Sequence, residues 1–192
     1  MIGRLNKIGS EQSPGVHPAI AAYVPLDGFH LTREQLSSFP NSTAAHARRG
    51  AAFTFDAASF LELVKDLREP LVPESKTVHA PSFDHALKDP IQDDITILPT
   101  ARIIVFEGNY LSLNHGHWKE AAELMDELWF VEVDIQIARQ RLIARHVKSG
   151  IAANEVEAAR RADESDLING QEILVDRLAV QEVIISTEDD IR

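Results

Sequence analysis

Two acidic residues stand where an apolar run gives way to a turn, and both could do acid–base or metal chemistry. Asp27 follows the run 19–26, Glu107 follows the run 102–106, and a glycine comes directly after each acid. If both runs are parallel strands, their carboxyl ends share one edge of a sheet, where ligands bind in open α/β folds. Each glycine permits a sharp turn and a close ligand approach. An acid here is also a common turn former or helix cap, so the pattern alone leaves both interpretations open.

A basic stripe is expected on the helix predicted for residues 135–148. Arg141, Arg145 and Lys148 fall at positions i, i+4 and i+7, so they share one face of that helix. The planar forks of arginine match phosphate oxygens and could clamp a phosphoryl group during transfer. Cations near the carboxyl end of a helix also complement its dipole without any ligand. The residues alone slightly favour this second interpretation.

The eight histidines form no recognised metal-binding pattern. His115 and His117 are the closest pair in sequence, and they lie in a polar stretch before Trp118. The chain has no cysteine, so neither a disulfide framework nor a thiolate metal site is available. No Gly-x-Ser-x-Gly pattern is present. A dedicated histidine metal site and a serine hydrolase are therefore disfavoured.

Strands that alternate with helices predict an α/β fold to position these residues. Four apolar runs predict strands: 19–26, 102–106, 128–133 and 183–186. The second and third do not alternate, which is typical of strands buried on both faces of a parallel sheet. Helices are predicted after the cap Asp56, at 135–148 and at 154–169. The proline-rich stretch 69–99 predicts little core, with short strands at 76–80 and 95–98.

Composition indicates one folded domain. The chain has 192 residues, of which 44% are hydrophobic and 26% charged, as in globular proteins. The formal net charge of −11 argues against binding to nucleic acid, because a phosphate backbone requires clustered cations. No stretch approaches the roughly 18 apolar residues needed to span a bilayer. We expect a soluble, cytoplasmic protein with neither nucleic-acid nor membrane partners.

Five ordered motifs together resemble one family, the uridine kinase/phosphoribulokinase-like P-loop kinases. The likeness runs from about residue 20 to residue 185 and is greatest for the branch with pantothenate kinase-like and fructose kinase-like proteins. The motifs are VPLDGFH at 24–30, RRG to FD at 48–56, PSFDH at 81–85, EGNYL at 107–111 and RLIARH at 141–146.

The resemblance implies a three-layer α/β fold with a mostly parallel sheet, and ATP-dependent phosphorylation of a small-molecule hydroxyl. It implies that Asp27 orients the acceptor hydroxyl or takes its proton, and that Glu107 holds Mg²⁺ through water. Arg141 and Arg145 would belong to a lid over ATP, and Asn169 would lie near the nucleotide base. The acceptor, a sugar, nucleoside or pantothenate-like molecule, would be lined by His30, Arg49, Phe83, Asp84, His85, Asn109 and Tyr110.

The phosphate-binding loop of that family is absent from the sequence. Members carry Gly-x-x-x-x-Gly-Lys-Ser/Thr after their first strand, whereas no lysine here follows a glycine. We therefore expect a single domain over 1–192 that is truncated at its N-terminus, with 1–18 as a poorly ordered remnant. The missing central strand would lie between the strands ending at Asp27 and Glu107 and the one ending at Asp134. Its loss would leave two unpaired edges.

Three outcomes follow from that loss. The two halves of the sheet close directly, a partner fills the gap, or the chain is a fragment, which is the outcome we favour. As this chain we expect weak or absent kinase activity, because phosphoryl transfer depends on positioning and electrostatics. A non-catalytic binding or regulatory protein is the alternative, with homo-oligomers possible through the sheet edges. A metal-dependent hydrolase using Asp27, Glu107 and histidines is a lesser alternative.

Overall fold

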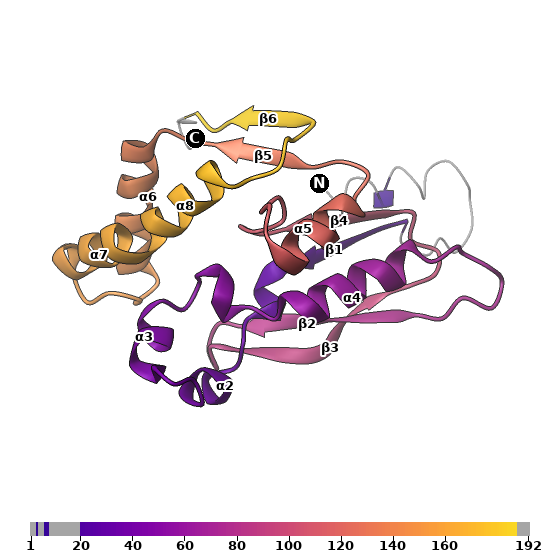
Figure 1. The fold of residues 1–192 in the computed structure, drawn as a ribbon, viewed down its shortest axis with the longest axis horizontal. Helices are drawn as coiled ribbons and strands as arrows, with labels where there is room; N and C mark the ends of the chain where they lie inside the picture. Colours follow the sequence, from indigo (N-terminus) through magenta and orange to yellow (C-terminus); the bar gives the residue numbers. More distant parts are fainter. Residues whose placement is uncertain (1–2, 4–5, 8–19, 188–192) are drawn as a thin grey trace.

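The structure of the chain is a computed structural model that describes residues 3, 6–7 and 20–187. The prediction of a poorly ordered remnant at 1–18 lies almost wholly outside the described residues. Within the described part, three two-stranded sheets form the framework (Figure 1). β1 (Ala21–Pro25) pairs in parallel with β4 (Ile103–Glu107), and β5 (Trp129–Glu132) pairs in parallel with β6 (Glu182–Ile185). β2 (Val78–Asp84) and β3 (Asp89–Ile97) form an antiparallel hairpin.

Helices connect and cover these strands. The helix expected after Asp56 is α4 (Ala57–Arg68), and the Asp56 carboxylate accepts a hydrogen bond from Ser59 N–H at 2.9 Å. The helix expected at 135–148 is α6 (Ile135–Lys148), capped by Asp134. The other elements are the short turns η1 (Leu26–Phe29) and η2 (Ala52–Thr54), helices α2 (Arg33–Ser37), α3 (Ser42–Ala47), α5 (Gly116–Glu123), α7 (Glu155–Arg161) and α8 (Leu167–Val175), and the π-helical turn η3 (Ala162–Asp166).

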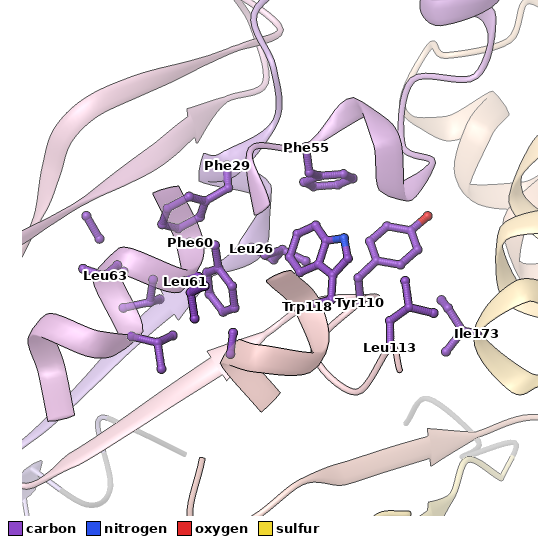
Figure 2. Packing of buried hydrophobic residues seen from close by; sticks show 14 of the residues in the cluster. Leu26, Phe29, Phe55, Phe60, Leu61, Leu63, Tyr110, Leu113, Trp118 and Ile173 are labelled. Atoms are coloured by element: carbon purple, nitrogen blue, oxygen red, sulfur yellow. The ribbon is translucent and has the colours of Figure 1, made fainter. Parts of the chain in front are cut away.

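The core lies where α4 and α5 pack against β1, β4 and the hairpin (Figure 2). Phe60 of α4 is at its centre, with its ring centroid 5.2 Å from that of Phe29, 5.4 Å from Phe106 and 5.8 Å from Trp118. Burying an aromatic side chain of this size contributes about 1.5 to 3 kcal/mol. From the C-terminal helices, Ile173 of α8 reaches the same cluster. This core holds the end of β1 and the turn after it in place.

The two parallel pairs do not join into one sheet. β4 pairs with β1 and β5 pairs with β6, and no ladder in the described part of the chain links β4 to β5. The α/β class with parallel strands is confirmed, and of the outcomes considered for a missing strand, direct closure of the sheet is wrong. The expected burial of β4 and β5 on both faces is also wrong, because Ile103 of β4 is exposed and Trp129 and Val131 of β5 are more than half exposed. Among the described strands, each of these two has a neighbour on one side only.

Two other expectations need correction. The stretch 69–99 carries a long hairpin in place of two short strands, and Ala80 and Ile97 of that hairpin are buried in the core. The polar helix expected at 154–169 is divided into α7, the π-helical turn and α8, and it continues to Val175. Among the described residues, no helix combines the length and the apolar character required to cross a membrane.

Candidate active site

The two acids predicted from the sequence lie at the carboxyl ends of neighbouring strands. The register pairs Pro25 of β1 with Glu107 of β4, and Asp27 follows Pro25 by two residues. The side chain of Asp27 is 53% exposed, and Glu107 is also exposed. Both carboxylates are therefore accessible from one edge, as the sequence predicted. Their charges and position suit a site that accepts a proton or holds a hydrated cation.

The glycines that follow these acids are required by packing. A Cβ on Gly28 would collide with the carbonyl group of Pro81, and one on Gly108 would collide with the side chain of Leu26. Gly28 itself is buried. The space that the sequence suggested for a ligand beside these glycines is thus filled by the protein, and the glycines serve to bring β1, β4 and the hairpin close together.

Tyr23 is a site residue that the sequence did not reveal. Its hydroxyl donates to Glu107 Oε2 at 3.1 Å across the β1–β4 pair. Partial burial raises the pKa of Tyr23, and the hydrogen bond to Glu107 and its negative charge raise it further. Tyr23 therefore remains a neutral donor at physiological pH and holds the Glu107 carboxylate. Nothing in its apolar run distinguishes it from a core residue.

A cluster of aromatic rings lies beside Asp27, formed by His30, Phe55, Phe83 and His85. The ring of His30 sits between Phe55, at 3.9 Å between centroids, and Phe83, at 5.0 Å. Burial lowers the pKa of His30, although a hydrogen bond with the Asp27 carbonyl oxygen and the Asp27 charge oppose this; the charges of Arg49 and His85 lower it further. His30 is consequently neutral near pH 7 and offers a hydrogen-bonding ring nitrogen rather than a positive charge.

Arg49 is fixed against the same cluster. Its guanidinium lies over the Phe83 ring, 5.6 Å from the centroid, and donates to the Leu31 carbonyl at 3.0 Å and to Asp89 Oδ1 at 2.8 Å. Asp89 also accepts from the backbone N–H and the side chain of Arg33. The sequence did not single out Asp89; its only signal was a position before Pro90 at the start of a strand.

The remaining predicted acceptor residues have different environments. The ring of His85 lies 5.2 Å from Phe83 and belongs to the cluster. Asp84 instead accepts from the N–H groups of Ala86 and Leu87 in the hairpin turn, which lowers the pKa of its carboxyl. Asn109 is exposed in the turn after β4. Tyr110 is fully buried, and its hydroxyl donates to the Gly50 carbonyl at 2.6 Å.

The predicted lid residues lie on α6, and the residue predicted near the nucleotide base lies on α8. Arg141 donates to Ser186 Oγ at 2.8 Å and to the Thr187 carbonyl at 2.9 Å, just beyond β6. Arg145 is exposed one turn further along α6. Asn169 is buried and accepts a hydrogen bond of 2.8 Å from Arg48, which joins α8 to the loop after α3. In this structure, Asn169 therefore connects two parts of the protein rather than facing an open surface.

The resemblance implies both Mg²⁺ and ATP, and the described residues supply few ligands for either. Asp27 and Glu107 offer exposed carboxylate oxygens, the ligands that Mg²⁺ prefers. In the described part of the chain, no group of three or more His, Asp or Glu side chains could hold a metal ion. The sequence contains no loop that would supply backbone N–H groups and a lysine to the phosphates of ATP.

Solved structures with a similar fold identify the class of protein. YFH7 from Saccharomyces cerevisiae, described as "a putative P-loop containing kinase with a circular permutation", has a TM-score of 0.76 and 30% identity, over 89% of this chain and 59% of that chain. A "putative fructose transport system kinase" from Silicibacter sp. TM1040 also has a TM-score of 0.76, with 28% identity, over 95% of this chain and 81% of that chain. The fold is that of the P-loop kinases.

Sequence relatives then identify the family. The ATP-dependent kinase-like protein notR' of Aspergillus versicolor is 52% identical over 159 residues, which cover 83% of this chain and 92% of that protein. The chain belongs to the family of ATP-dependent P-loop kinases that includes notR' and YFH7. It spans only 50% to 63% of the length of several further relatives. No protein-family model matches the sequence.

Proposed function

We propose that this chain forms the acceptor side of an ATP-dependent kinase site, which recognises a hydroxyl group on a sugar, a nucleoside or a pantothenate-like molecule. The observation that supports it is the position of the Asp27 carboxylate, which lies exposed just after β1, near the end of β4 at Glu107 and near the aromatic cluster of His30, Phe83 and His85. Rings of this kind stack on a flat or weakly polar ligand face, and neutral His30 adds a hydrogen-bonding nitrogen.

The chemistry assigned to Asp27 is acceptance of a proton. As the acceptor oxygen forms a bond to the γ-phosphorus of ATP, the bond from that phosphorus to the ADP oxygen breaks, and the hydroxyl proton passes to the Asp27 carboxylate. Glu107, held by Tyr23 at 3.1 Å, would bind hydrated Mg²⁺, which neutralises phosphate charge when it is present. Arg49 is committed to Asp89 and the Leu31 carbonyl, so we assign it the role of shaping the pocket.

Alone, the chain should bind an acceptor and transfer phosphate weakly or not at all. Phosphoryl transfer depends on donors that hold the β- and γ-phosphates, and the sequence has no loop of that type. A binding or regulatory role beside an intact kinase is the second candidate, and the separated parallel pairs favour it because they leave strand edges for a partner. In both cases the acceptor pocket is used.

The test measures acceptor binding and turnover in the same preparation of the full chain. A panel of sugars, nucleosides and pantothenate is screened by calorimetry and by thermal shift, with and without Mg-ATP, while ADP release is followed. We expect one class of acceptor to bind, and Phe83→Ala to weaken its binding by roughly tenfold through loss of one stacked ring. Phe53→Ala is the matched control, because Phe53 is an exposed aromatic residue that makes no contact with His30.

Turnover separates the two candidates. Absence of ADP release together with acceptor binding favours a binding or regulatory role. Measurable turnover favours a competent kinase, and Asp27→Asn should then reduce it by about a hundredfold or more while acceptor affinity changes little. If no member of the panel binds, or if Phe53→Ala and Phe83→Ala weaken binding equally, the acceptor pocket proposed here is wrong.

A further inference from the structure

A cavity lies between the turn η2, the start of α5 and the end of α8. Its volume is about 700 Å³, which is within the range of small-molecule sites in proteins. None of the acceptor-site residues Asp27, His30 and Phe83 lines it. Phe55 does line it, and the same ring contacts His30. The cavity is therefore a neighbour of the proposed acceptor site and not a part of it.

Aromatic and aliphatic side chains form most of the wall of this cavity. The rings of Phe55 and Trp118, which are buried, line it together with the buried side chain of Leu113. Phe53 and Val175 line it as well, and they are 52% and 76% exposed, as residues at the mouth of a cavity are. The wall thus presents ring faces on which a flat apolar group can pack.

One side of the cavity carries negative charge. Glu172 and Asp176 are four residues apart at the end of α8, and both line it. Arg48 also lines it, but its guanidinium lies 3.9 Å from Glu172 and donates to Asn169 at 2.8 Å, so the charges of Arg48 and Glu172 offset each other. Among the described residues, no hydrogen bond or ion pair engages the Asp176 carboxylate. Its charge is available to a ligand, and the carboxyl end of α8 adds to it.

These groups suit an organic cation better than a metal ion. Four side chains of metal-binding type line the cavity: His115, His117, Glu172 and Asp176. No three His, Asp or Glu side chains in the described part of the chain could hold a metal ion, however, and His117 lies 3.1 Å from Glu120 outside the cavity wall. An organic cation requires less, because one carboxylate and the face of an aromatic ring both attract it.

We propose that this cavity binds a small arylalkylamine, a molecule in which a short alkyl chain joins an aromatic ring to an ammonium group. The ring packs against Phe53 and Trp118, and the ammonium group lies beside Asp176 at the end of α8. The formal net charge of −11 favours the approach of such a cation. The acceptor chemistry proposed above is not needed for this inference.

The probe is phenethylamine, and 2-phenylethanol is its uncharged counterpart of similar shape. The chain has two tryptophans, so the full chain with Trp129→Phe serves as the parent, and the fluorescence of Trp118 alone reports binding. In this parent, Asp176→Asn removes the charge beside the cavity, and Phe53→Ala removes the ring at its mouth. Asp93→Asn is the matched control, because Asp93 is also exposed but does not line this cavity.

We expect saturable binding of phenethylamine, about threefold to fivefold tighter than that of 2-phenylethanol, with a difference that shrinks in salt. Asp176→Asn should remove most of this difference by weakening only the binding of the amine. Phe53→Ala should weaken the binding of the amine by about twofold to fivefold, as expected for loss of a cation–π contact at an exposed site, and Asp93→Asn should leave it unchanged. Absence of amine binding, equal effects of Asp176→Asn and Asp93→Asn, or unchanged binding in Phe53→Ala would overturn the proposal.

Discussion

At the scale of single residues, the two tyrosines show how position decides the role of one chemical group. Tyr23 extends from β1 to the exposed carboxylate of Glu107, where water competes for the same hydrogen bond. Tyr110 was predicted from family resemblance to line the acceptor site. In the structure its ring packs on Phe55 and Trp118, and its hydroxyl donates to Gly50 O at 2.6 Å. Tyr23 holds the Glu107 carboxylate in position, whereas Tyr110 supports the loop that carries Arg49.

Tyr110→Phe should therefore lower the free energy of unfolding by about 1 to 2 kcal/mol, because the Gly50 carbonyl loses its buried donor. Tyr23→Phe removes an exposed hydroxyl, so its effect should stay within about 0.5 kcal/mol. Urea unfolding of both variants against the parent chain measures the difference. Equal effects of the two substitutions would contradict the role given to the Tyr110 hydrogen bond.

The buried Tyr110 also predicts how the stability of the protein changes at alkaline pH. Burial raises the pKa of Tyr110, with a further rise from the charge of Glu172. A raised pKa means that the folded state retains the proton while the unfolded state loses it above about pH 10. The stabilisation is thus complete below pH 10 and decreases as pH rises above it. In Tyr110→Phe, this alkaline loss of stability should be smaller, as measured by urea unfolding at pH 9 and pH 11.

At the scale of elements, the sequence predicted what periodicity and capping control. The α6 helix was predicted with its observed ends, because Asp134 and Gly150 bound a regular apolar rhythm, and the strand–acid–glycine pattern correctly placed Asp27 and Glu107 at one edge. The short helices α2, α3 and α5 were missed, since each has less than three turns of pattern. The hairpin was underestimated because its polar residues face solvent. Contacts such as Arg49 with Asp89 join residues 40 positions apart, which local patterns cannot reveal.

Asp89 connects three elements, so its substitution should disturb the pocket more than a surface charge would. It accepts from Arg33, the first residue of α2, and from Arg49 beside α3, and it begins β3. Asp89→Asn should cost about 1 to 2 kcal/mol of stability, as expected for partly exposed hydrogen bonds to a charged group. Asp126→Asn is the matched control: Asp126 also binds one arginine but is 83% exposed, so its loss should cost less than about 0.5 kcal/mol.

The contribution of Asp89 to stability should decrease at acidic pH. Burial alone would raise the pKa of Asp89, but the hydrogen bonds from Arg33 and the bond and charge of Arg49 outweigh it and lower the pKa below the usual value near 3.9. The Asp89 contribution is therefore present above about pH 4 and lost as pH falls toward the lowered pKa. Parent and Asp89→Asn stabilities should converge below that pH. A constant difference from pH 7 to pH 2 would show that the charge of Asp89 is not responsible.

At the scale of the whole molecule, the apolar core is unevenly distributed. The buried cluster draws on β1, the hairpin, α4 and α5, but of the described residues after β4 and α5 it includes Ile173 alone, with Phe130 partly buried against it. The β5–β6 pair instead exposes Trp129, Val131 and Ile185. Hydrogen bonds also join the C-terminal part to the rest, from Arg48 to Asn169 of α8 at 2.8 Å and from Leu178 N–H to the Ser112 carbonyl at 2.8 Å.

This distribution predicts two levels of protection against amide exchange. Residues of β5, β6 and α6 should open with a lower free energy than those of β1, β4 and α4, because opening them exposes less buried apolar surface. In native-state exchange at increasing urea, amides of β5, β6 and α6 should lose their protection before global unfolding. Tyr110→Phe should lower the protection of β1, β4 and α4 by the same free energy as it lowers global stability. If both groups exchange with the same opening free energy, the unpaired edges of β4 and β5 do not divide the molecule. The contacts between its two parts would then couple them as tightly as a shared sheet does.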